Sequence, residues 1–454
     1  MSSSDLLNIS RQAMSNSQAA ISVTAKNIAN VNTEGYKRRR IDFTGYQSNV
    51  GSLGLSMQYG EMTVARIKEQ FIDNKIYKEN QNLGKYATDN LIYPQIEDIF
   101  GEPNDAALNN MYNEYWTAWN KLSIDPESEA LRTILVNKGQ NLANTFGRIH
   151  GDLKMLQNQI SLDVQGKVNE ANSILGKIDD INGIIQNTYG SAGNDLLDER
   201  DMLLEKITKI MEVDLQFETN GVVRITSGGQ VVLDNGYQNL LTYDTALEDG
   251  FMTSIVKFEN GTHRPDILKG ELGSLIEMNR EIIPDYIDKL NNMAIQITNE
   301  VNNIHREGYN LDGVTGVNFF KPNITNAGNF KVNSAVELNT ELVATTFTAG
   351  ESGNGDMARA MADLKFNKFM DGSTLNNYYG NIVTDIGNNV QEAEFLLSSE
   401  EKVLINLKNQ QDSVSGVSND EEMTNLIQYQ QTYQAAARLV NTSQEMVTVL
   451  LNMI

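Results

Sequence analysis

Both ends of the chain carry an apolar pattern that predicts a long helix with a coiled-coil seam. Within residues 423–454, apolar or small side chains recur at alternating spacings of three and four: Leu426, Tyr429, Tyr433, Ala436, Val440, Ser443, Val447, Leu450 and Ile454. Residues 1–36 carry a similar ladder with one apolar and one small-residue edge: Leu7, Ser10, Met14, Ser17, Ile21, Thr24, Ile28 and Val31. Such a seam needs a partner. We therefore expect the two ends to pair with each other, or with copies of themselves in an assembly.

The distribution of proline supports helix at both ends. All six prolines lie from Pro94 to Pro322, so residues 1–93 and 323–454 contain none. An interior proline costs a helix about 3 kcal/mol. The proline-free ends therefore meet a requirement of uninterrupted helix.

The interior predicts further helices and one change of period. Apolar residues recur at helical spacing over residues 128–189, 195–211, 275–304 and 376–412. Residues 212–260 instead alternate, with Asn-Gly and Gly-Gly turns, which is the strongest short-range signal for hairpins. A Gly- and Asn-rich segment, residues 308–355, contains two strand-like stretches at Phe330–Val332 and Leu342–Phe347.

These patterns predict an elongated, mainly α, multi-domain protein with an inserted antiparallel β region. The terminal helices pair at one end, a helical bundle forms the middle, and a small β-rich part lies outside. The predicted domains are a terminal coiled-coil assembly domain (residues 1–80 with 405–454), a helical rod-like domain (81–211 with 268–404) and a β-rich insert (212–267).

Composition excludes several classes of function. The net charge of −23 argues against a nucleic-acid partner, because neutralising phosphates requires an excess of Lys and Arg. The chain has no cysteine, and its three histidines are isolated. No carboxylate pair stands out as an acid and base. We therefore expect no catalytic residues, no cofactor, no metal site and no enzyme activity.

Three short motifs have alternative interpretations. The basic run Lys37–Arg40 is either a phosphate or localisation patch or, as we favour, a solvated strand or loop. Gly350–Gly355 resembles a phosphate loop but lacks the Lys-Ser/Thr that follows one. Asn310–Gly313 has too few spaced carboxylates for a calcium loop.

Targeting signals are absent from the sequence. The first residues lack the basic and apolar regions of a secretory signal peptide. No apolar run approaches the roughly 20 residues that span a bilayer. The expectation is a soluble protein, either cytoplasmic or exported without a cleaved signal, with no membrane insertion.

The termini resemble a known family. Ile28–Tyr36 (IANVNTEGY), with the preceding residues 23–27, resembles the N-terminal motif of bacterial flagellar rod, hook and hook-associated proteins. Asn425–Arg438 (NLIQYQQTYQAAAR), with the last residues 450–454, resembles the matching C-terminal motif. Glu34 stands where proline is common in the family, which affects the details of the turn.

The interior resembles the hook–filament junction members of that family. The residues that carry this likeness are Tyr93–Glu102, Tyr115–Trp119, Asp125-Pro126, Ala130–Arg132, Asn194–Asp201 and His305–Gly313. The likeness covers the chain except roughly residues 320–355, where junction members often have a large insert.

The resemblance implies a structural role in the extracellular part of the flagellum. It implies type III export without a cleaved signal peptide, assembly as a ring between hook and filament, terminal helices packed in the inner tube and a β portion facing outward. The implied partners are the hook protein, the second junction protein, copies of the chain itself, and a cytoplasmic export chaperone at the C-terminal helix. The alternatives are a hook or distal-rod protein of the same family and a freestanding coiled coil or adhesin.

The expected assembly interface consists of the apolar ladder residues Leu7, Met14, Ile21, Ile28, Val31, Leu426, Tyr429, Tyr433, Ala436, Val440, Val447 and Leu450. We expect the turn residues Asn30, Asn32, Gly35 and Tyr36 to fix the conformation of the chain between the first helix and the next segment. The sequence does not give the number of subunits in the ring.

Overall fold

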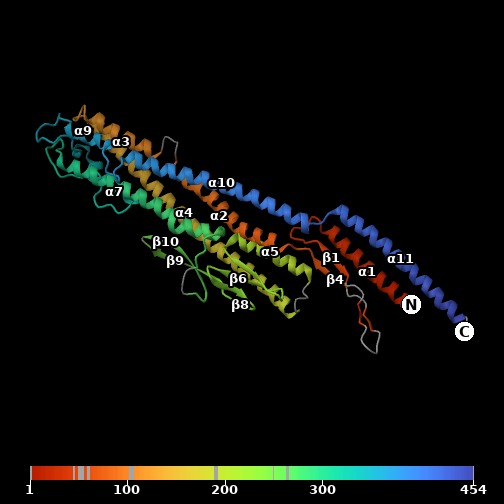
Figure 1. The fold of residues 1–454 in the computed structure, drawn as a ribbon. Helices are drawn as coiled ribbons and strands as arrows, with labels where there is room; N and C mark the ends of the chain where they lie inside the picture. Colours follow the sequence, from red (N-terminus) through yellow and green to blue (C-terminus); the bar gives the residue numbers. More distant parts are fainter. Residues whose placement is uncertain are drawn as a thin grey trace.

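The structure is a computed structural model of the whole chain, and it describes residues 3–43, 47–49, 56–58, 62–101, 107–188, 193–248, 250–261 and 265–452. The molecule is elongated, and both termini lie at the same end (Figure 1). The predicted mainly α architecture with an inserted antiparallel β region is confirmed.

The two chain ends form an antiparallel helix pair. Helix α1 (Ser3–Ala29) lies along α11 (Asn419–Asn452), which is the last described helix (Figure 1). Few charges interrupt these helices: between residues 423 and 452 only Arg438 and Glu445 are charged. Their pairing satisfies the prediction that each end needs a partner helix.

The proline-free residues 1–93 do not form one uninterrupted helix. Helix α1 ends at Ala29, and α2 begins only at Gln70. Between them lie β1 (Arg39–Phe43), β2 (Gln47–Asn49), β3 (Ser56–Gln58) and β4 (Met62–Arg66), with β1 paired to β4 and β2 to β3, both antiparallel. The absence of proline permits a helix but does not require one. Gly35, which follows α1, has a φ of +77°, a left-handed conformation that glycine adopts readily.

Helices of 8 to 59 residues build the rod. They are α2 (Gln70–Phe100), α3 (Leu108–Leu122), α4 (Glu129–Asn187), α5 (Asn194–Ile210), α6 (Gly270–Glu277), α7 (Ile283–Glu307) and α10 (Leu375–Ser415). A short π-helical stretch, Met278–Ile282, joins α6 to α7. The helices predicted at residues 128–189, 195–211 and 376–412 are therefore confirmed within three residues at each end. Ser128 caps α4 by accepting a hydrogen bond from the Leu131 N–H.

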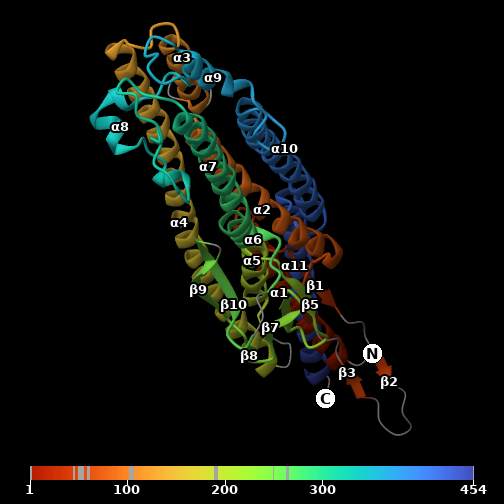
Figure 2. The same cartoon turned by 90° about the vertical axis from the view of Figure 1, so that its left-hand side faces the viewer.

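The inserted β region lies beside α4, outside the helical layer (Figure 2). It contains an antiparallel sheet in the order β5 (Asp214–Phe217), β6 (Val223–Ser227), β7 (Gln230–Asp234), β8 (Tyr237–Gln238). A hairpin of β9 (Leu241–Glu248) and β10 (Phe251–Phe258) follows. Positive φ angles at Gly221, Gly228, Gly229, Asn235 and Gly236 match the predicted turns.

The end of the rod away from the termini is closed by short elements. The strand-like stretches predicted within residues 308–355 form only isolated bridges, Phe320 with Val332 and Tyr309 with Thr346. The region instead contains 3₁₀ turns at Ala327–Asn329 and Thr340–Leu342 and the helix α8 (Ser334–Leu338). Helix α9 (Asp356–Asp363) and a 3₁₀ turn at Leu364–Phe366 come next. Asn326, Asn333 and Asn339 cap these short helices, so the Asn-rich composition favours turns over strands.

Aromatic side chains fill this end of the core. The rings of Tyr115, Trp119 and Phe319 lie 5.5–6.4 Å apart, and Trp119 also contacts His305. His305 is fully buried, with Nδ1 2.7 Å from the Val317 carbonyl, while Nε2 accepts a hydrogen bond from the Ala344 N–H. Within the loop Gly350–Gly355, Gly355 is closely packed, because a Cβ there would overlap the Ser123 carbonyl, whereas Gly350 and Gly353 have open space around them.

Candidate assembly site

Helices α1 and α11, which carry all of the predicted assembly-interface residues except Val31, pack against each other. The centre of the contact is formed by small, buried side chains: Ser10, Ser17, Ala20, Thr24, Ala436 and Ser443. The larger ladder residues are half-buried: Leu7, Met14, Ile21, Ile28, Val31, Leu426, Tyr429, Tyr433, Val440 and Val447. The side chain of Leu450 lies outside the described residues. The small residues of the ladder are thus buried within one chain, whereas the larger ones keep part of their surface exposed.

The hydroxyl groups in this seam are satisfied within their own helix. Ser10 Oγ donates to the Leu6 carbonyl at 2.7 Å, and Ser17 Oγ donates to the Ala13 carbonyl at 2.8 Å. A serine bonded in this way places only a small surface in the seam. The two helices can consequently approach closely without leaving buried polar groups unpaired.

A second set of apolar side chains on α11 is exposed, and the sequence reasoning missed it. We call it the outer stripe: Met423, Ile427, Leu439, Met446 and Val449, each about half exposed. At 100° per residue, Met423, Ile427 and Val449 lie about 140° to 180° from Ala436, whereas Leu439 and Met446 lie about 60° and 80° from it. An exposed apolar stripe on a weakly charged helix is typical of a protein interface.

The base of the helix pair is held by a network centred on Asn27, which is buried. Its Nδ2 donates to the Arg39 carbonyl and to Glu422 Oε2, both at 2.9 Å. Its Oδ1 accepts from Tyr36 Oη at 2.8 Å and from the Arg39 backbone N–H at 3.1 Å. Arg38 Nε completes the network by donating to Glu422 Oε1 at 2.8 Å. The network thus ties the end of α1 and the start of α11 to β1.

The predicted turn residues lie directly beside this network. Asn30 Nδ2 donates to the Lys26 carbonyl at 2.9 Å, which closes the last turn of α1. Gly35 packs on Met202 of α5, where any Cβ would overlap the methionine side chain. Tyr36 enters the Asn27 network, while Asn32 is exposed. The turn therefore contacts both the helix pair and the rod.

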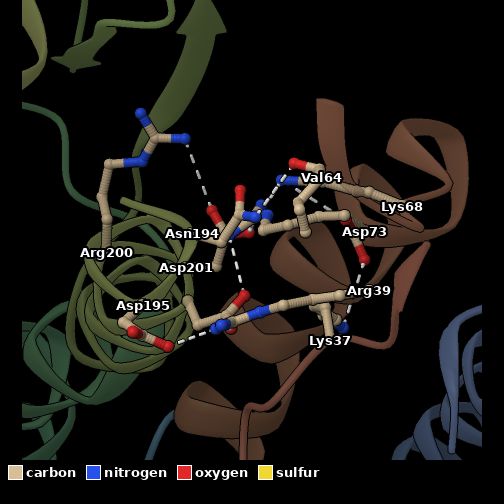
Figure 3. Close-up of polar contacts among 11 residues, drawn as sticks. Lys37, Arg39, Val64, Lys68, Asp73, Asn194, Asp195, Arg200 and Asp201 are labelled. Atoms are coloured by element: carbon tan, nitrogen blue, oxygen red, sulfur yellow. Dashed lines mark hydrogen bonds and ion pairs between the residues drawn. The ribbon is translucent and has the colours of Figure 1, made fainter. Parts of the chain in front are cut away.

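A row of alternating charges joins this base to the rod (Figure 3). We call it the charge row: the cations Lys37, Arg39, Arg66 and Lys68 face the carboxylates Asp73, Asp195, Asp198 and Asp201. Arg39 and Arg66 are direct partners in the β1–β4 pairing. Asp195, Asp198 and Asp201 follow one face of α5 at intervals of three residues, and Asp73 belongs to α2.

Neighbouring cations share carboxylates along the row. Asp198 lies 3.4 Å from Arg39 Nη2 and 2.9 Å from Arg66 Nη1. Asp201 lies 2.7 Å from Arg66 Nη2 and 3.0 Å from Lys68 Nζ. Lys68 and Lys37 then approach Asp73 at 3.4 and 3.9 Å. Arg39 also pairs with Asp195, whose side chain is 80% exposed.

Burial and pairing act on these groups in opposite directions. Burial raises the pKa of Asp198, although Arg66 and Arg39 oppose the shift. Burial alone would also raise the pKa of Asp201, but Lys68, Arg66 and Arg200 together hold that pKa below its usual value. The hydrogen bond from Arg39 lowers the pKa of Asp195. Asp201 is thus held charged by its cations despite its burial.

The prediction that Lys37–Arg40 is solvated is wrong for two of its four residues. Lys37 and Arg39 are buried, and each faces a carboxylate of the rod. Arg38 faces Glu422 of α11, whereas Arg40 pairs with Asp42 at the surface. The carboxylates that neutralise the run lie at least 36 positions away in sequence, apart from Asp42, so composition alone could not reveal their burial.

The main apolar core ends at the charge row. Among the described residues, this core contains buried side chains only from Tyr77 to Ile386. A small cluster of Ile76, Leu404 and Leu407 lies between α2 and α10. The terminal unit, meaning α1, β1, β4 and α11, therefore meets the rod mainly through polar contacts.

The described residues contain neither a cluster suited to a metal ion nor a membrane-spanning helix. In that part of the chain, no group of three or more His, Asp or Glu side chains is arranged to hold a metal ion. Of the helices that the structure describes, none combines the length and the apolar composition needed to cross a bilayer.

These features define a class of protein: an elongated structural subunit whose paired ends are built for assembly. Family models agree with this description. The model of flagella basal body rod proteins matches residues 7–37, and the C-terminal model of flagellar basal body rod FlgEFG proteins matches residues 410–453. The chain is thus an axial structural component of the bacterial flagellum.

The interior defines the particular family. The model of the flagellar hook-associated protein FlgK helical domain matches residues 93–320, which is half of the chain. The chain belongs to the FlgK family, that of flagellar hook-associated protein 1. Asn27, Arg39 and the α5 carboxylates were not among the site residues predicted from the sequence.

Relatives and a solved structure are similar over most of the chain. Flagellar hook-associated protein 1 of Bacillus subtilis is 29% identical, covering 98% of this chain and 97% of the relative. The protein of the same name from Escherichia coli K12 is 23% identical, covering 99% and 100%. The flagellar hook junction protein FlgK from Burkholderia pseudomallei has a similar fold, with a TM-score of 0.67 at 14% identity, covering 75% of this chain and all of that one.

Proposed function

We propose that this protein forms the junction between the flagellar hook and the filament, as a structural component needed for filament assembly. The observation that carries the proposal is the terminal helix pair, which lies outside the main core and exposes an apolar stripe. Such a pair is poorly buried in one chain alone. Neighbouring subunits supply the missing contacts.

Within the assembly, the two surfaces of the terminal pair have different tasks. The ladder joins α1 to α11 of the same chain, and the outer stripe contacts α1 or α11 of adjacent copies in a ring. The terminal assembly domain spans residues 1–80 with 405–454, the rod-like domain spans 81–211 with 268–404, and the β insert, residues 212–267, faces outward. The end of the main core at Tyr77 supports the first boundary.

The partners are the hook protein on one side and the second junction protein on the other. Before assembly, the C-terminal helix binds an export chaperone, which covers the outer stripe. The subunit leaves the cell through the flagellar type III apparatus without a cleaved signal peptide and is located in the extracellular flagellum. Its role is structural, without enzyme activity, and the charge row joins structural elements.

A strain lacking the gene tests the junction role directly. Electron microscopy of that strain should show bare hooks, and flagellin should accumulate in the medium. Cells without hooks would instead assign the protein to the hook or the distal rod. Normal filaments would refute a role in the flagellar axis.

A further inference from the structure

The second half of α10 packs on α2 beyond the end of the main apolar core. Helix α10 lies along α2 (Figure 1), but it contributes buried side chains to the main core only from Leu375 to Ile386. Beyond that point the two helices share the small cluster described above, and Gln411 donates a hydrogen bond to Asp73. We call residues 387–415 the linking segment, because they lead from the rod to α11.

Two carboxyl groups face each other where the linking segment meets α2. Glu79 belongs to α2 and Glu400 to α10, and the two side chains lie within hydrogen-bonding reach. Glu400 Oε1 is buried and receives no hydrogen bond in the structure. Neither group takes part in the ion pairs found among the described residues. Two ionised carboxylates are both acceptors, so they can bond to each other only when one of them carries a proton.

The surroundings decide which of the two carries it. Asn82 Nδ2 donates to Glu79 Oε2 at 2.8 Å, and a hydrogen bond of this kind favours the ionised form of the acceptor. Glu400 has no such donor on its own helix, because the residues one turn away on α10 are all apolar: Leu396, Leu397, Val403 and Leu404. The proton between the two groups therefore belongs to Glu400.

The charged groups around Glu400 come from two further elements. Glu79 approaches from α2, and Lys269 approaches from the residue before α6. Lys75, one turn before Glu79, lies instead over the Phe71 ring, 4.5 Å from its centroid. Burial and the charge of Glu79 raise the pKa of Glu400 to about 7, and Lys269 opposes this shift only in part. The unperturbed value is 4.5, so the contact is stabilised by the proton at low pH and loses that stability as the pH rises from 4.5 to about 7.

We propose that Glu79 and Glu400 form a proton-dependent contact that fastens the linking segment to α2 and loosens it when the shared proton is lost. After the loss, two carboxylates face each other and repel. The Arg38 N–H donates to the Ser415 carbonyl at 3.0 Å, and this bond keeps the end of α10 attached to the terminal unit. The part of α10 between Ile386 and Ser415 is therefore the part that loosens, and the connection between rod and terminal unit becomes more compliant at alkaline pH.

Hydrogen exchange of the full-length protein tests this proposal. Protection factors, corrected for the intrinsic effect of pH on exchange, are compared at about pH 5.5 and about pH 8.5. Each pKa unit corresponds to a tenfold change, but Glu400 is only partly buried, so we expect protection of the linking segment to fall roughly tenfold. Protection in α4 serves as the internal reference and should stay constant. Constant protection of the linking segment would overturn the proposal.

Three variants assign the effect to the carboxyl pair. Glu400→Gln places an amide donor beside Glu79 at every pH, so protection should stay high at about pH 8.5 and its pH dependence should disappear. Glu79→Gln should also remove the pH dependence, because its amide can donate to Glu400. Glu401→Gln, at the next and exposed residue of α10, is the matched control and should behave as the wild type. A wild-type pH dependence in either Glu400→Gln or Glu79→Gln would overturn the proposal.

Discussion

Removing Glu422 should open the terminal helix pair at its base. The side chain is 2% exposed and accepts hydrogen bonds from Asn27 and Arg38. Truncating one member of a fully buried ion pair costs about 3–5 kcal/mol. Arg38 is 20% exposed and keeps its contact with Glu421, so we expect about 2–3 kcal/mol for Glu422→Ala.

Hydrogen exchange measured by mass spectrometry provides the assay, because it reports local opening in a long chain that need not unfold in one step. A cost of about 2–3 kcal/mol corresponds to roughly 30- to 150-fold faster exchange in α1 and α11. Exchange in α4 should not change.

Glu421→Ala is the matched control for this prediction. Glu421 is the preceding residue in the same first turn of α11, and it also contacts Arg38, but its side chain is 62% exposed. We expect an effect below about 0.5 kcal/mol. Similar exchange in the two variants would refute the reasoning that the Asn27 network anchors the helix pair.

Three further predictions follow from the rod and the termini. Gly84→Ala should lower the Tm by several degrees, because its Cβ would overlap a carbonyl of α5, whereas Gly176→Ala, with open space around the Cβ, should not. Burial lowers the pKa of His305 to about 4, below its unfolded value of 6.5, so folding favours the neutral form. This preference contributes about 3 kcal/mol of stability, which is complete above pH 6.5 and should be lost as the pH falls to 4. Over that range the Tm of the wild type should fall more than the Tm of His305→Gln. Ile427→Asp on the outer stripe should block incorporation into flagella while α1 and α11 keep their slow hydrogen exchange, whereas Val440→Asp in the ladder should block incorporation and also speed that exchange.

The sequence predicted the helices and hairpins well, because those signals are local. The ladder of α11 and the Asn-Gly turns each lie within one segment, and each has a single common structural solution. Local signals fail where two structures fit the same residues. The proline-free stretch before Gln70 and the Asn-rich segment 308–355 are both examples, since strand or turn there depends on what packs nearby.

The Asn27 network and the charge row could not be predicted, because their groups meet only after folding. Arg39 and Asp198 are 159 positions apart, and Asn27 and Glu422 are 395 apart. Before folding, each looks like an ordinary solvated residue. The three-residue spacing of Asp195, Asp198 and Asp201 was visible within a motif of the family, but only the structure shows that β1 and β4 face it.

The most direct test of the junction role is to locate the protein in intact flagella. Leu338, at the end of the rod away from the termini, is 90% exposed, and a Leu338→Cys variant would carry the chain's only thiol. Labelling with a gold-conjugated maleimide, followed by electron microscopy, should show one narrow band between hook and filament. Label distributed along the hook, along the filament, or only within the cell body would contradict the account.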